Sequence, residues 1–368
     1  MKIAVLSSHT SSLFWFRMDM MKDFIKKGHT VIALGSEPES IWKKKFEKHN
    51  IDYRQLYVER NGMNPLKDLK TLKSLYFFMK KEKPDKIFAY QAKTIVYGCI
   101  AAKMNGISEV YPLIAGLGSV FRGEGFKNKI IKTIMKVEYW IACTCSKKVF
   151  FQNQDDKNMF IQNRLLKENK TIIINGSGVN LEVFKPTPLP KTPSFLFIGR
   201  LIKDKGIVEY LEACKAIKAK HPDVRCLLVG PYDSNPSALK PEELNSYIEK
   251  GSIEYFGEQN DVSSFISQCS TYVLPSYHEG TPKTVLEAMA MGRAIITSDA
   301  PGCKETVIDS LNGYLVKVKD IQGLINKMEY LISNQEACVS MGQESAKIAK
   351  EKYDVNIINR LIMQSMDL

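Results

Sequence analysis

Several patterns that would point to metal, redox or disulfide chemistry are missing from this 368-residue sequence. Its eight cysteines form no Cys-x-x-Cys pair and lie in mostly apolar segments, as buried thiols in a reducing compartment do. There is no Asp-x-Asp, and no cluster of His, Cys and carboxylate residues has the spacing of metal ligands. No Gly-x-Gly-x-x-Gly follows a predicted strand and opens a helix, which argues against a dinucleotide dehydrogenase. We therefore expect neither a metal ion nor a cofactor.

Long apolar segments are also absent. A helix needs about 20 apolar residues to cross a bilayer, and no stretch of the sequence approaches this without a charge. The run from Met1 to Leu6 is too short for a signal peptide and has the pattern of a first β-strand. We therefore expect a cytoplasmic protein whose contact with a membrane is peripheral.

The composition is that of a packed globular protein, with 44% hydrophobic and 25% charged residues. Because single cores rarely grow past roughly 250 to 300 residues, a chain of this length predicts two domains. The net charge of +12 is uneven, since residues 1–150 hold 27 Lys and Arg against 13 Asp and Glu. A basic half is compatible with a nucleic acid, an anionic membrane, a phosphorylated substrate or merely a solvated lysine-rich surface, and charge alone does not choose among them.

Short β-branched segments alternate with longer amphipathic ones, as in parallel sheets covered by helices on both faces. The predicted strands are 2–6, 30–34, 86–89, 110–113, 148–151 and 171–174, then 194–198, 225–229, 253–256, 271–274, 294–297 and 314–316. We also expect helices from about residue 16 to Lys27 and over residues 336–366. The proline-bearing segment 185–193 separates the two series of strands. The pattern predicts an α/β fold of two Rossmann-like, doubly wound domains, 1–184 and 194–350, that face each other across a cleft. We expect residues 351–368 to form a helix that packs back towards the first domain.

The most informative segment follows a predicted strand and reads Glu-Gly-Thr-Pro-Lys-Thr-Val-Leu-Glu. It places Glu279 in a loop at the carboxyl end of the strand and Glu287 within the next helix. Two carboxylates suit a sugar nucleotide, which presents hydroxyls on its transferred ring and on its ribose. Gly280, Thr281 and Pro282 open the helix, where free amides favour a diphosphate and proline loses no hydrogen bond.

A second segment, Gly-Arg-Leu-Ile-Lys-Asp-Lys-Gly from Gly199 to Gly206, also joins a strand to a helix. Arg200 can bind a phosphate bidentately, while Lys205 acts as a point charge. Each segment alone has a structural explanation, because a Glu at a helix start compensates the helix dipole and Gly-Arg…Lys-Gly can mark helix ends. Together, at matching loops of one domain, they indicate a binding site for a diphosphate.

These two segments resemble the motifs of retaining glycosyltransferases of family 4, which have the two-domain GT-B fold. Further matches at residues 151–156, 175–186 and 230–231 extend the resemblance over nearly the whole chain. The resemblance implies catalytic roles for Arg200 and Lys205 on the donor diphosphate and for Glu279 at the transferred sugar, with Glu287 on the ribose. The other donor-binding residues that it implies are Gly199, Gly230, Glu258, Gln259, Gly280, Thr281, Pro282 and Lys283.

Residues 112–121 also resemble a subgroup that builds bacterial lipid-linked oligosaccharides and surface polysaccharides. This resemblance implies transfer of a hexose or N-acetylhexosamine from a UDP-sugar, with retention, to a glycan acceptor linked to polyprenyl diphosphate. Such an enzyme acts in the assembly of surface polysaccharides or glycoprotein glycans. The candidates on the acceptor side or in the cleft are His9, Ser12, Arg17, Gly116 and Gly118. Many family members have a Gly-Gly pair and a histidine where this sequence has Ser7-Ser8 and Tyr90-Gln91, so whether His9 or His278 acts in catalysis stays open.

In residues 126–140, lysines alternate with apolar and aromatic residues at helical spacing. This pattern is typical of a core-facing helix with a solvated lysine face, or of a helix that lies on an anionic membrane. Together with the basic first half, it predicts loose association with the inner face of the cytoplasmic membrane. We expect no nucleic acid partner, because no known binding module is present.

Two other functions are compatible with the same residues. A sugar-nucleotide epimerase of the same fold would also bind a diphosphate but needs no acceptor. A non-catalytic nucleotide-sugar-binding protein would keep the fold without turnover.

Overall fold

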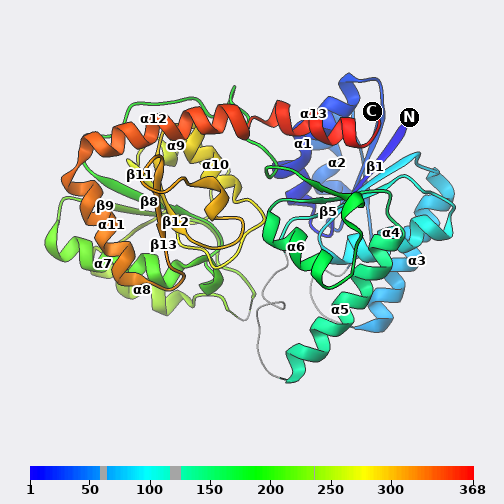
Figure 1. The fold of residues 1–368 in the computed structure, drawn as a ribbon, viewed down its shortest axis with the longest axis horizontal. Helices are drawn as coiled ribbons and strands as arrows, with labels where there is room; N and C mark the ends of the chain where they lie inside the picture. The colour runs from blue at the N-terminus through cyan, green and yellow to red at the C-terminus, as the bar shows by residue number, and fades with distance from the viewer. Residues whose placement is uncertain (59–63, 117–125, 236) are drawn as a thin grey trace. The chain divides into compact units, whose positions relative to one another are not determined.

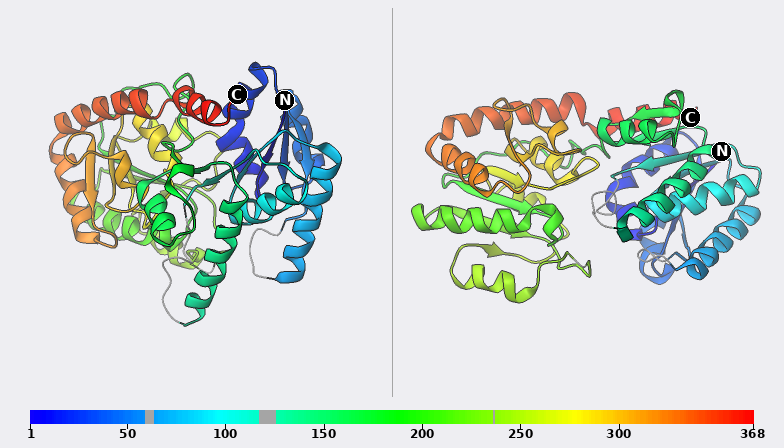
Figure 2. Two further views of the ribbon diagram at one scale, coloured as in Figure 1. Left: turned by 45° about the vertical axis from the view of Figure 1, so that its right-hand side comes forward. Right: turned by 60° about the horizontal axis from the view of Figure 1, so that its bottom comes forward.

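The structure, a computed structural model, describes residues 1–58, 64–116, 126–235 and 237–368. The chain forms two compact units, one made of Met1–Ser177 with Ile357–Leu368 and the other of Gly178–Asn356. Each unit has its own parallel sheet with helices on both faces (Figure 1). Two further views show the same layers (Figure 2). The predicted class, two doubly wound α/β units, is confirmed.

Within the described residues, the sheet of the first unit has the order β3-β2-β1-β4-β5-β6-β7, with all neighbours parallel. Its strands are β1 Lys2–Leu6, β2 Thr30–Gly35, β3 Asp52–Gln55, β4 Lys86–Tyr90, β5 Val110–Ile114, β6 Val149–Phe151 and β7 Thr171–Ile173. The strands predicted in this half are confirmed to within one residue at each end. The additional edge strand β3 was missed because its only apolar residue is Tyr53, which stacks on Phe46 of the preceding helix.

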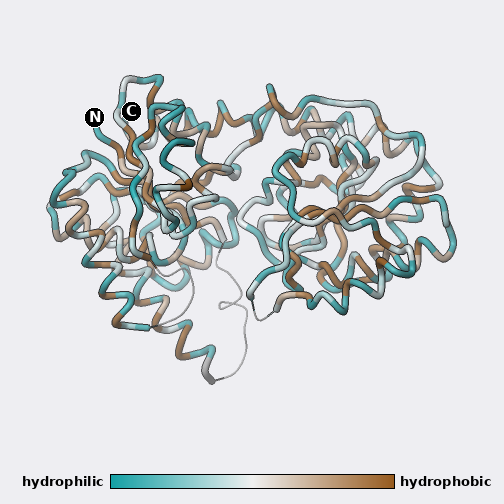
Figure 3. The backbone as a smooth tube through the Cα atoms, turned by 180° about the vertical axis from the view of Figure 1, so that it is seen from behind, coloured by the Kyte–Doolittle hydropathy of each residue, from teal (hydrophilic) through white to brown (hydrophobic). Residues whose placement is uncertain are grey.

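The helices of the first unit are α1 Thr10–Lys26, α2 Glu39–Glu47, α3 Pro65–Glu82, α4 Ala92–Met104, α5 Phe126–Thr144, α6 Gln154–Gln162 and the C-terminal α13 Val355–Ser365, most of which lies in this unit. Successive residues of β1 point to opposite faces of the sheet. Ile3 and Val5 pack in one apolar cluster with residues of α1 and α13, while Ala4 and Leu6 pack in another with residues of α3 and α4. Figure 3 shows the hydrophobic residues along the central strands of each unit.

Two helix predictions need correction. The first helix begins at Thr10 rather than near residue 16, because Ser12 bonds back to the His9 carbonyl oxygen through both its amide and its hydroxyl. Its end at Lys26, before Gly28 with φ +81°, is within one residue of the predicted end at Lys27. The segment 336–366 is two helices, α12 Gln335–Lys352 and α13, because the chain between them pairs with Val179 as an extended bridge at Asp354.

The sheet of the second unit has the order β10-β9-β8-β11-β12-β13 within the described residues. Its strands are β8 Ser194–Ile198, β9 Arg225–Val229, β10 Glu254–Tyr255, β11 Thr271–Leu274, β12 Ala294–Ser298 and β13 Gly313–Val316, all predicted to within one residue. Its helices are α7 Ile207–Lys220, α8 Pro241–Glu249, α9 Ser263–Ile266, α10 Lys283–Ala290, α11 Ile321–Ser333 and α12. The segment 185–193 lies within this unit, where the buried Arg293 binds the carbonyl oxygen of Thr187 at 2.9 Å.

Each sheet has one point at which the strand order reverses. In the first sheet β1 lies between β2 and β4, and in the second β8 lies between β9 and β11. Ligands of doubly wound sheets bind beyond the carboxyl ends of the strands at such a point. Ligand-binding residues are therefore expected after β1 and β4 in the first unit, and after β8 and β11 in the second.

In the described part of the chain, no helix combines the length and the apolar character needed to cross a membrane.

Candidate active site

The loops after β8 and β11 of the second unit lie against each other and carry the predicted catalytic residues. The amide of Tyr277 donates to the carbonyl oxygen of Asp204 at 2.9 Å, and the hydroxyl of Ser276 donates to the same oxygen at 3.2 Å. Gly206 has φ +75°, and a Cβ there would lie 2.1 Å from the carbonyl oxygen of Pro275. Only glycine fits this position, so the second glycine of the Gly-Arg…Lys-Gly segment allows the two loops to touch.

Lys205 and Glu279 form the centre of this site. The ammonium group of Lys205 donates a short hydrogen bond to the carboxylate of Glu279. Their side chains are only 23% and 11% exposed, so the pair is less screened than a surface ion pair. The sequence placed both residues at the same edge of the sheet, and the structure brings them into direct contact.

A third loop, after β12, supports Glu279 and was missed in the sequence. The amide of Glu279 donates to the carbonyl oxygen of Pro301 at 2.9 Å. Gly302 has φ +80°, and a Cβ there would lie 2.2 Å from the carbonyl oxygen of Glu279 and 2.4 Å from that of Gly280. The Pro-Gly pair that follows a predicted strand was the available signal, because such pairs mark tight turns.

Glu287 lies on α10, one turn after Lys283. Its carboxylate is buried and lies 3.7 Å from the ammonium group of Lys283. Burial raises the pKa of Glu287 to about 7, although Lys283 acts in the opposite direction. The start of α10 is held by Thr284, which accepts a hydrogen bond from the buried hydroxyl of Tyr272 at 2.6 Å. Gly280, Thr281 and Pro282 form the loop before this helix rather than its first turn.

The raised pKa of Glu287 predicts a dependence of stability on pH. An unfolded glutamate titrates near pH 4.3, so the folded state binds this proton more tightly and the free energy of unfolding falls as the pH rises to about 7. We expect Glu287→Gln to remove the contribution of this group to the pH dependence. The free energy of unfolding of the variant, relative to that of the wild type, should therefore rise by up to about 3 kcal/mol from pH 5 to pH 8. Urea unfolding of the variant and the wild type at both pH values measures this difference. Glu258→Gln, at an exposed position, should keep the dependence of the wild type, and a constant difference for Glu287→Gln would contradict the prediction.

Arg200 does not join the pair of Lys205 and Glu279. Its guanidinium bonds Asp233 at 2.9 Å and is 41% exposed. Asp233, which the sequence reasoning did not single out, follows the Gly230-Pro231 turn. A Cβ at Gly230 would lie 1.8 Å from the carbonyl oxygen of Gly199, so these glycines let the ends of β8 and β9 approach each other.

Glu258 and Gln259 are exposed in the loop after β10. This loop is tied to the end of β9 by a hydrogen bond from the amide of Gly230 to the carbonyl oxygen of Gly257 at 2.8 Å. Both residues therefore lie at the same edge of the sheet as the catalytic candidates. Their roles as donor ligands stay predictions.

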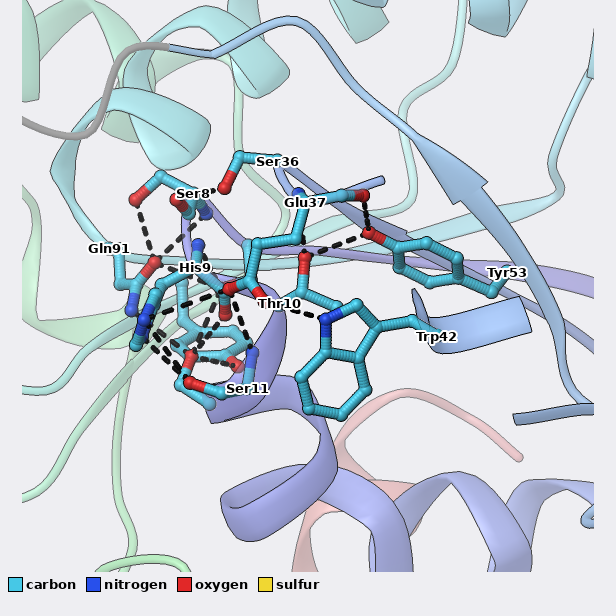
Figure 4. Close-up of polar contacts among 12 residues, drawn as sticks. Ser8, His9, Thr10, Ser11, Ser36, Glu37, Trp42, Tyr53 and Gln91 are labelled. Atoms are coloured by element: carbon cyan, nitrogen blue, oxygen red, sulfur yellow. Dashed lines mark hydrogen bonds and ion pairs between the residues drawn. The ribbon is translucent and has the colours of Figure 1, made fainter. Parts of the chain in front are cut away.

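The corresponding edge of the first unit carries a polar cluster around Gln91 (Figure 4). The side-chain oxygen of Gln91 accepts hydrogen bonds from the Ser7 hydroxyl at 2.9 Å and from the amide and hydroxyl of Ser8 at 2.9 and 2.7 Å. Its amide nitrogen donates to the hydroxyl of Ser12 at 3.2 Å. Ser12, a predicted site residue, thus lies at the junction of β1 and β4.

His9 lies in the same cluster, beside a carboxylate that the sequence did not reveal. Its Nε2 is 3.7 Å from Oε1 of Glu37, whose other oxygen accepts a hydrogen bond from the indole nitrogen of Trp42 at 2.6 Å (Figure 4). No local signal links these residues, because Glu37 and Trp42 follow a different strand. The arrangement places His9 beside a carboxylate at this edge of the sheet.

The remaining candidates divide by position. Arg17 is buried in α1, and Gly116 follows β5, whereas Gly118 lies outside the described residues. His278 lies in the loop of Glu279, where its carbonyl oxygen accepts a hydrogen bond from Ser276 at 3.5 Å. Among the described residues, no three His, Cys, Asp or Glu side chains gather as metal ligands, and independence of metal stays a prediction.

Comparisons with known proteins agree with this arrangement. Residues 180–348 match the family model of glycosyl transferases group 1, and residues 2–153 match that of glycosyl transferase 4-like proteins. The N,N'-diacetylbacillosaminyl-diphospho-undecaprenol alpha-1,3-N-acetylgalactosaminyltransferase of Campylobacter jejuni is 30% identical over 381 residues, which cover 100% of this chain and 98% of that protein. The UDP-Gal:alpha-D-GlcNAc-diphosphoundecaprenol alpha-1,3-galactosyltransferase of Escherichia coli is 30% identical over 72% of this chain and 70% of its own.

Solved structures share the fold. Anabaena HepE in complex with UDP and glucose matches with a TM-score of 0.81 at 19% identity, over 100% of this chain and 99% of that one. The sucrose-phosphate synthase of Thermosynechococcus elongatus matches with a TM-score of 0.83 at 18% identity, over 99% and 97% of the two chains. With the paired Lys205 and Glu279 in the predicted loops and a relative similar along its whole length, this chain belongs to the family 4 glycosyltransferases, enzymes of the GT-B fold that transfer a sugar from a nucleotide-sugar donor.

Proposed function

We propose that the enzyme transfers a hexose or N-acetylhexosamine from a UDP-sugar to a glycan acceptor carried on polyprenyl diphosphate. The observation that carries this proposal is that two relatives, each 30% identical to this chain, have names that specify acceptors linked to diphospho-undecaprenol. One relative is named for transfer of N-acetylgalactosamine, and the other is named for UDP-Gal as its donor. Both sugars are within the donor class that we expect.

In this proposal, Lys205 neutralises the diphosphate that leaves the donor. An ammonium group has three N–H donors, and Glu279 accepts from one of them, which leaves the others for phosphate oxygens. Glu279 thereby fixes the position of Lys205 before the donor arrives, so that little reorganisation is needed during transfer. Arg200 exchanges its exposed contact with Asp233 for a phosphate oxygen, because an exposed ion pair contributes little stability.

The proposed function can be tested by the release of nucleoside diphosphate from a panel of UDP- and GDP-sugars. Each donor is incubated with and without a polyprenyl-diphosphate-linked sugar acceptor. We expect release from one UDP-sugar only when the acceptor is present. Conversion of the donor without acceptor would instead show an epimerase, and donor binding without any turnover would show a nucleotide-sugar-binding protein. Release from a GDP-sugar alone would overturn the donor assignment.

We further propose that the enzyme works at the inner face of the cytoplasmic membrane, and that α5 contacts the lipid. Its side chains Met135 and Tyr139 face the core of the first unit. Apolar side chains on another face of the helix are about half exposed, namely Ile130, Ile134, Val137 and Trp140. These four recur three or four residues apart, which places them on one stripe, and the lysines at 129, 132 and 136 lie along one side of it. An apolar stripe bordered by lysines suits an anionic lipid surface.

The substitution Ile134→Glu should reduce binding to vesicles of phosphatidylglycerol and phosphatidylethanolamine by about 10-fold or more. The change replaces an inserted apolar side chain by a negative charge beside anionic headgroups. Co-sedimentation with the vesicles measures the effect. Ile41→Glu on α2 is the matched control, because Ile41 is similarly exposed but lies on another helix of the same unit. An equal loss for both variants would contradict a specific role of α5.

A further inference from the structure

Arg17 is a buried cation that has no counter-ion among the residues that the structure describes. Its side chain on α1 is 3% exposed, and its guanidinium lies over the rings of Tyr90 and Phe88, at 5.1 and 5.7 Å from their centroids. No hydrogen bond or ion pair joins it to any residue that the structure describes, and its Nε is buried without a partner. Burial lowers the pKa of Arg17 to about 10, so the group is still charged at neutral pH. Burying an unpaired charge destabilises the folded state, which indicates that Arg17 has a function other than stabilising the fold.

The guanidinium lies close to the polar edge of the first sheet. Tyr90 is the last residue of β4, and its hydroxyl is 2.8 Å from the hydroxyl of Ser12 in the cluster around Gln91. Helical side chains lean towards the N-terminus of their helix, and α1 begins directly after β1. Arg17 therefore extends from the second turn of α1 towards the point where β1 and β4 end.

Backbone strain marks the same place independently. Gln91 has φ +73° and ψ 139°, a backbone conformation that residues other than glycine rarely adopt. The hydrogen bonds of its side chain to Ser7, Ser8 and Ser12 hold it there. Such strained conformations persist only where many surrounding contacts hold them, and they are frequent at ligand-binding sites. An unpaired buried cation and a strained residue thus lie at one edge of the sheet.

We propose that Arg17 is the counter-ion of a phosphate group that binds at the carboxyl ends of β1 and β4, and that the diphosphate of the acceptor supplies this phosphate. None of the three guanidinium nitrogens of Arg17 has a hydrogen-bond partner among the described residues, and of the three only Nε is fully buried. The two terminal nitrogens are therefore accessible to solvent. These are the nitrogens through which arginine binds phosphate oxygens bidentately. Contact with the ring of Tyr90 fixes the plane of the guanidinium before the ligand arrives.

The carboxylate of Glu37 also lies near this edge, 3.3 Å from the amide of Ser11. It is engaged by the indole of Trp42 and by His9 rather than by Arg17. A phosphate therefore has to approach from the side of Gln91 and Tyr90, away from Glu37. The assignment of the acceptor diphosphate rests on the proposed function, whereas the phosphate site itself does not.

The test compares Arg17→Met with the wild type and with Arg54→Met. Arg54 is an exposed arginine of the same unit, paired with Asp52 at 2.9 Å, and serves as the matched control. All measurements are made with saturating UDP, which occupies the donor diphosphate site of the second unit. Thermal unfolding is followed with and without inorganic pyrophosphate, and KM is measured for acceptors with and without the diphosphate group.

We expect Arg17→Met to fold with a midpoint at least equal to that of the wild type, because it removes an unpaired buried charge. Pyrophosphate should stabilise the wild type and Arg54→Met but not Arg17→Met, and Arg17→Lys should keep part of the effect. The KM for the diphosphate-linked acceptor should rise about 10-fold or more in Arg17→Met, which corresponds to the loss of one charge-assisted contact. The KM for the donor and for an acceptor without diphosphate should change less than about twofold.

Two results would overturn the proposal. A lower midpoint of Arg17→Met, with equal loss of activity towards both acceptors, would show that Arg17 is structural. Equal stabilisation of all variants by pyrophosphate would show that the anion binds elsewhere. If pyrophosphate discriminates as expected but no diphosphate-linked acceptor is used, the phosphate site is supported and the proposed function is contradicted.

Discussion

Replacing Lys205 by alanine should lower the turnover of the enzyme by about 10²- to 10³-fold, the usual effect of removing one contact that stabilises developing charge. The physical reason is that Lys205 is held against Glu279 in a mostly buried environment, where its charge acts on the leaving diphosphate with little screening by water. The measurement is the acceptor-dependent release of UDP at saturating donor.

Lys203→Ala is the matched control for this variant. Lys203 lies two residues away in the same short helix, is exposed, and approaches a carboxylate only at 3.9 Å. We expect its turnover to stay within about twofold of the wild type. If Lys203→Ala and Lys205→Ala lose the same activity, the charge of this loop matters but the specific contact with Glu279 does not.

The variants Lys205→Ala and Glu279→Gln should also be non-additive, because each residue is the partner of the other. Removing one leaves the second without its counter-charge, so the double variant should lose less than the product of the two single losses. Simple additivity would show that the two side chains act independently during transfer.

The substitution Gly302→Ala should lower the free energy of unfolding by about 3 kcal/mol or more and weaken donor binding at the same time. Alanine at this position would have φ +80°, and its Cβ would overlap the carbonyl oxygens of Glu279 and Gly280. Both are backbone atoms, which cannot rotate away as a side chain can. The loop that carries Glu279 therefore has to move or the residue has to unfold locally.

Gly251→Ala separates backbone strain from steric overlap in this prediction. Gly251 also lies in the second unit and has φ +65°, but a Cβ there meets no atom within 4 Å. Its alanine variant should lose only about 1 kcal/mol, the cost of the left-handed conformation, and should keep the KM of the donor. Urea unfolding and donor kinetics measure both effects. If the two alanine variants were equally destabilised, the contact between Gly302 and the loop of Glu279 would have no energetic importance.

The positions of Lys205 and Glu279 at one edge of the second sheet could be predicted from the sequence, because these positions are encoded locally. Lys205 follows one strand within seven residues, and Glu279 follows another within five. In a parallel sheet the carboxyl ends of neighbouring strands meet at one edge, so two local motifs were enough to predict one site. The pairing of Arg200 with Asp233 could not be predicted in this way, because it depends on the course of a loop after a third strand.

The first unit shows the limit of such reasoning. His9 and Ser12 were candidates by their position after β1, but Glu37, Trp42 and Tyr90 follow or end other strands and carry no local signal. Whether a carboxylate stands beside a histidine depends on which strands become neighbours, and strand order is not a local property.

The sequence by itself determined the alternation of strands and helices, the two units and the loops that carry Lys205 and Glu279, because hydrophobic periodicity and turn residues act over a few positions. Only the tertiary structure decided that Gly302 supports Glu279, and that Arg17 is buried without a counter-ion among the residues that the structure describes. These features depend on contacts between residues far apart in the chain, and whether a charge has a partner is decided only when the surrounding elements have packed.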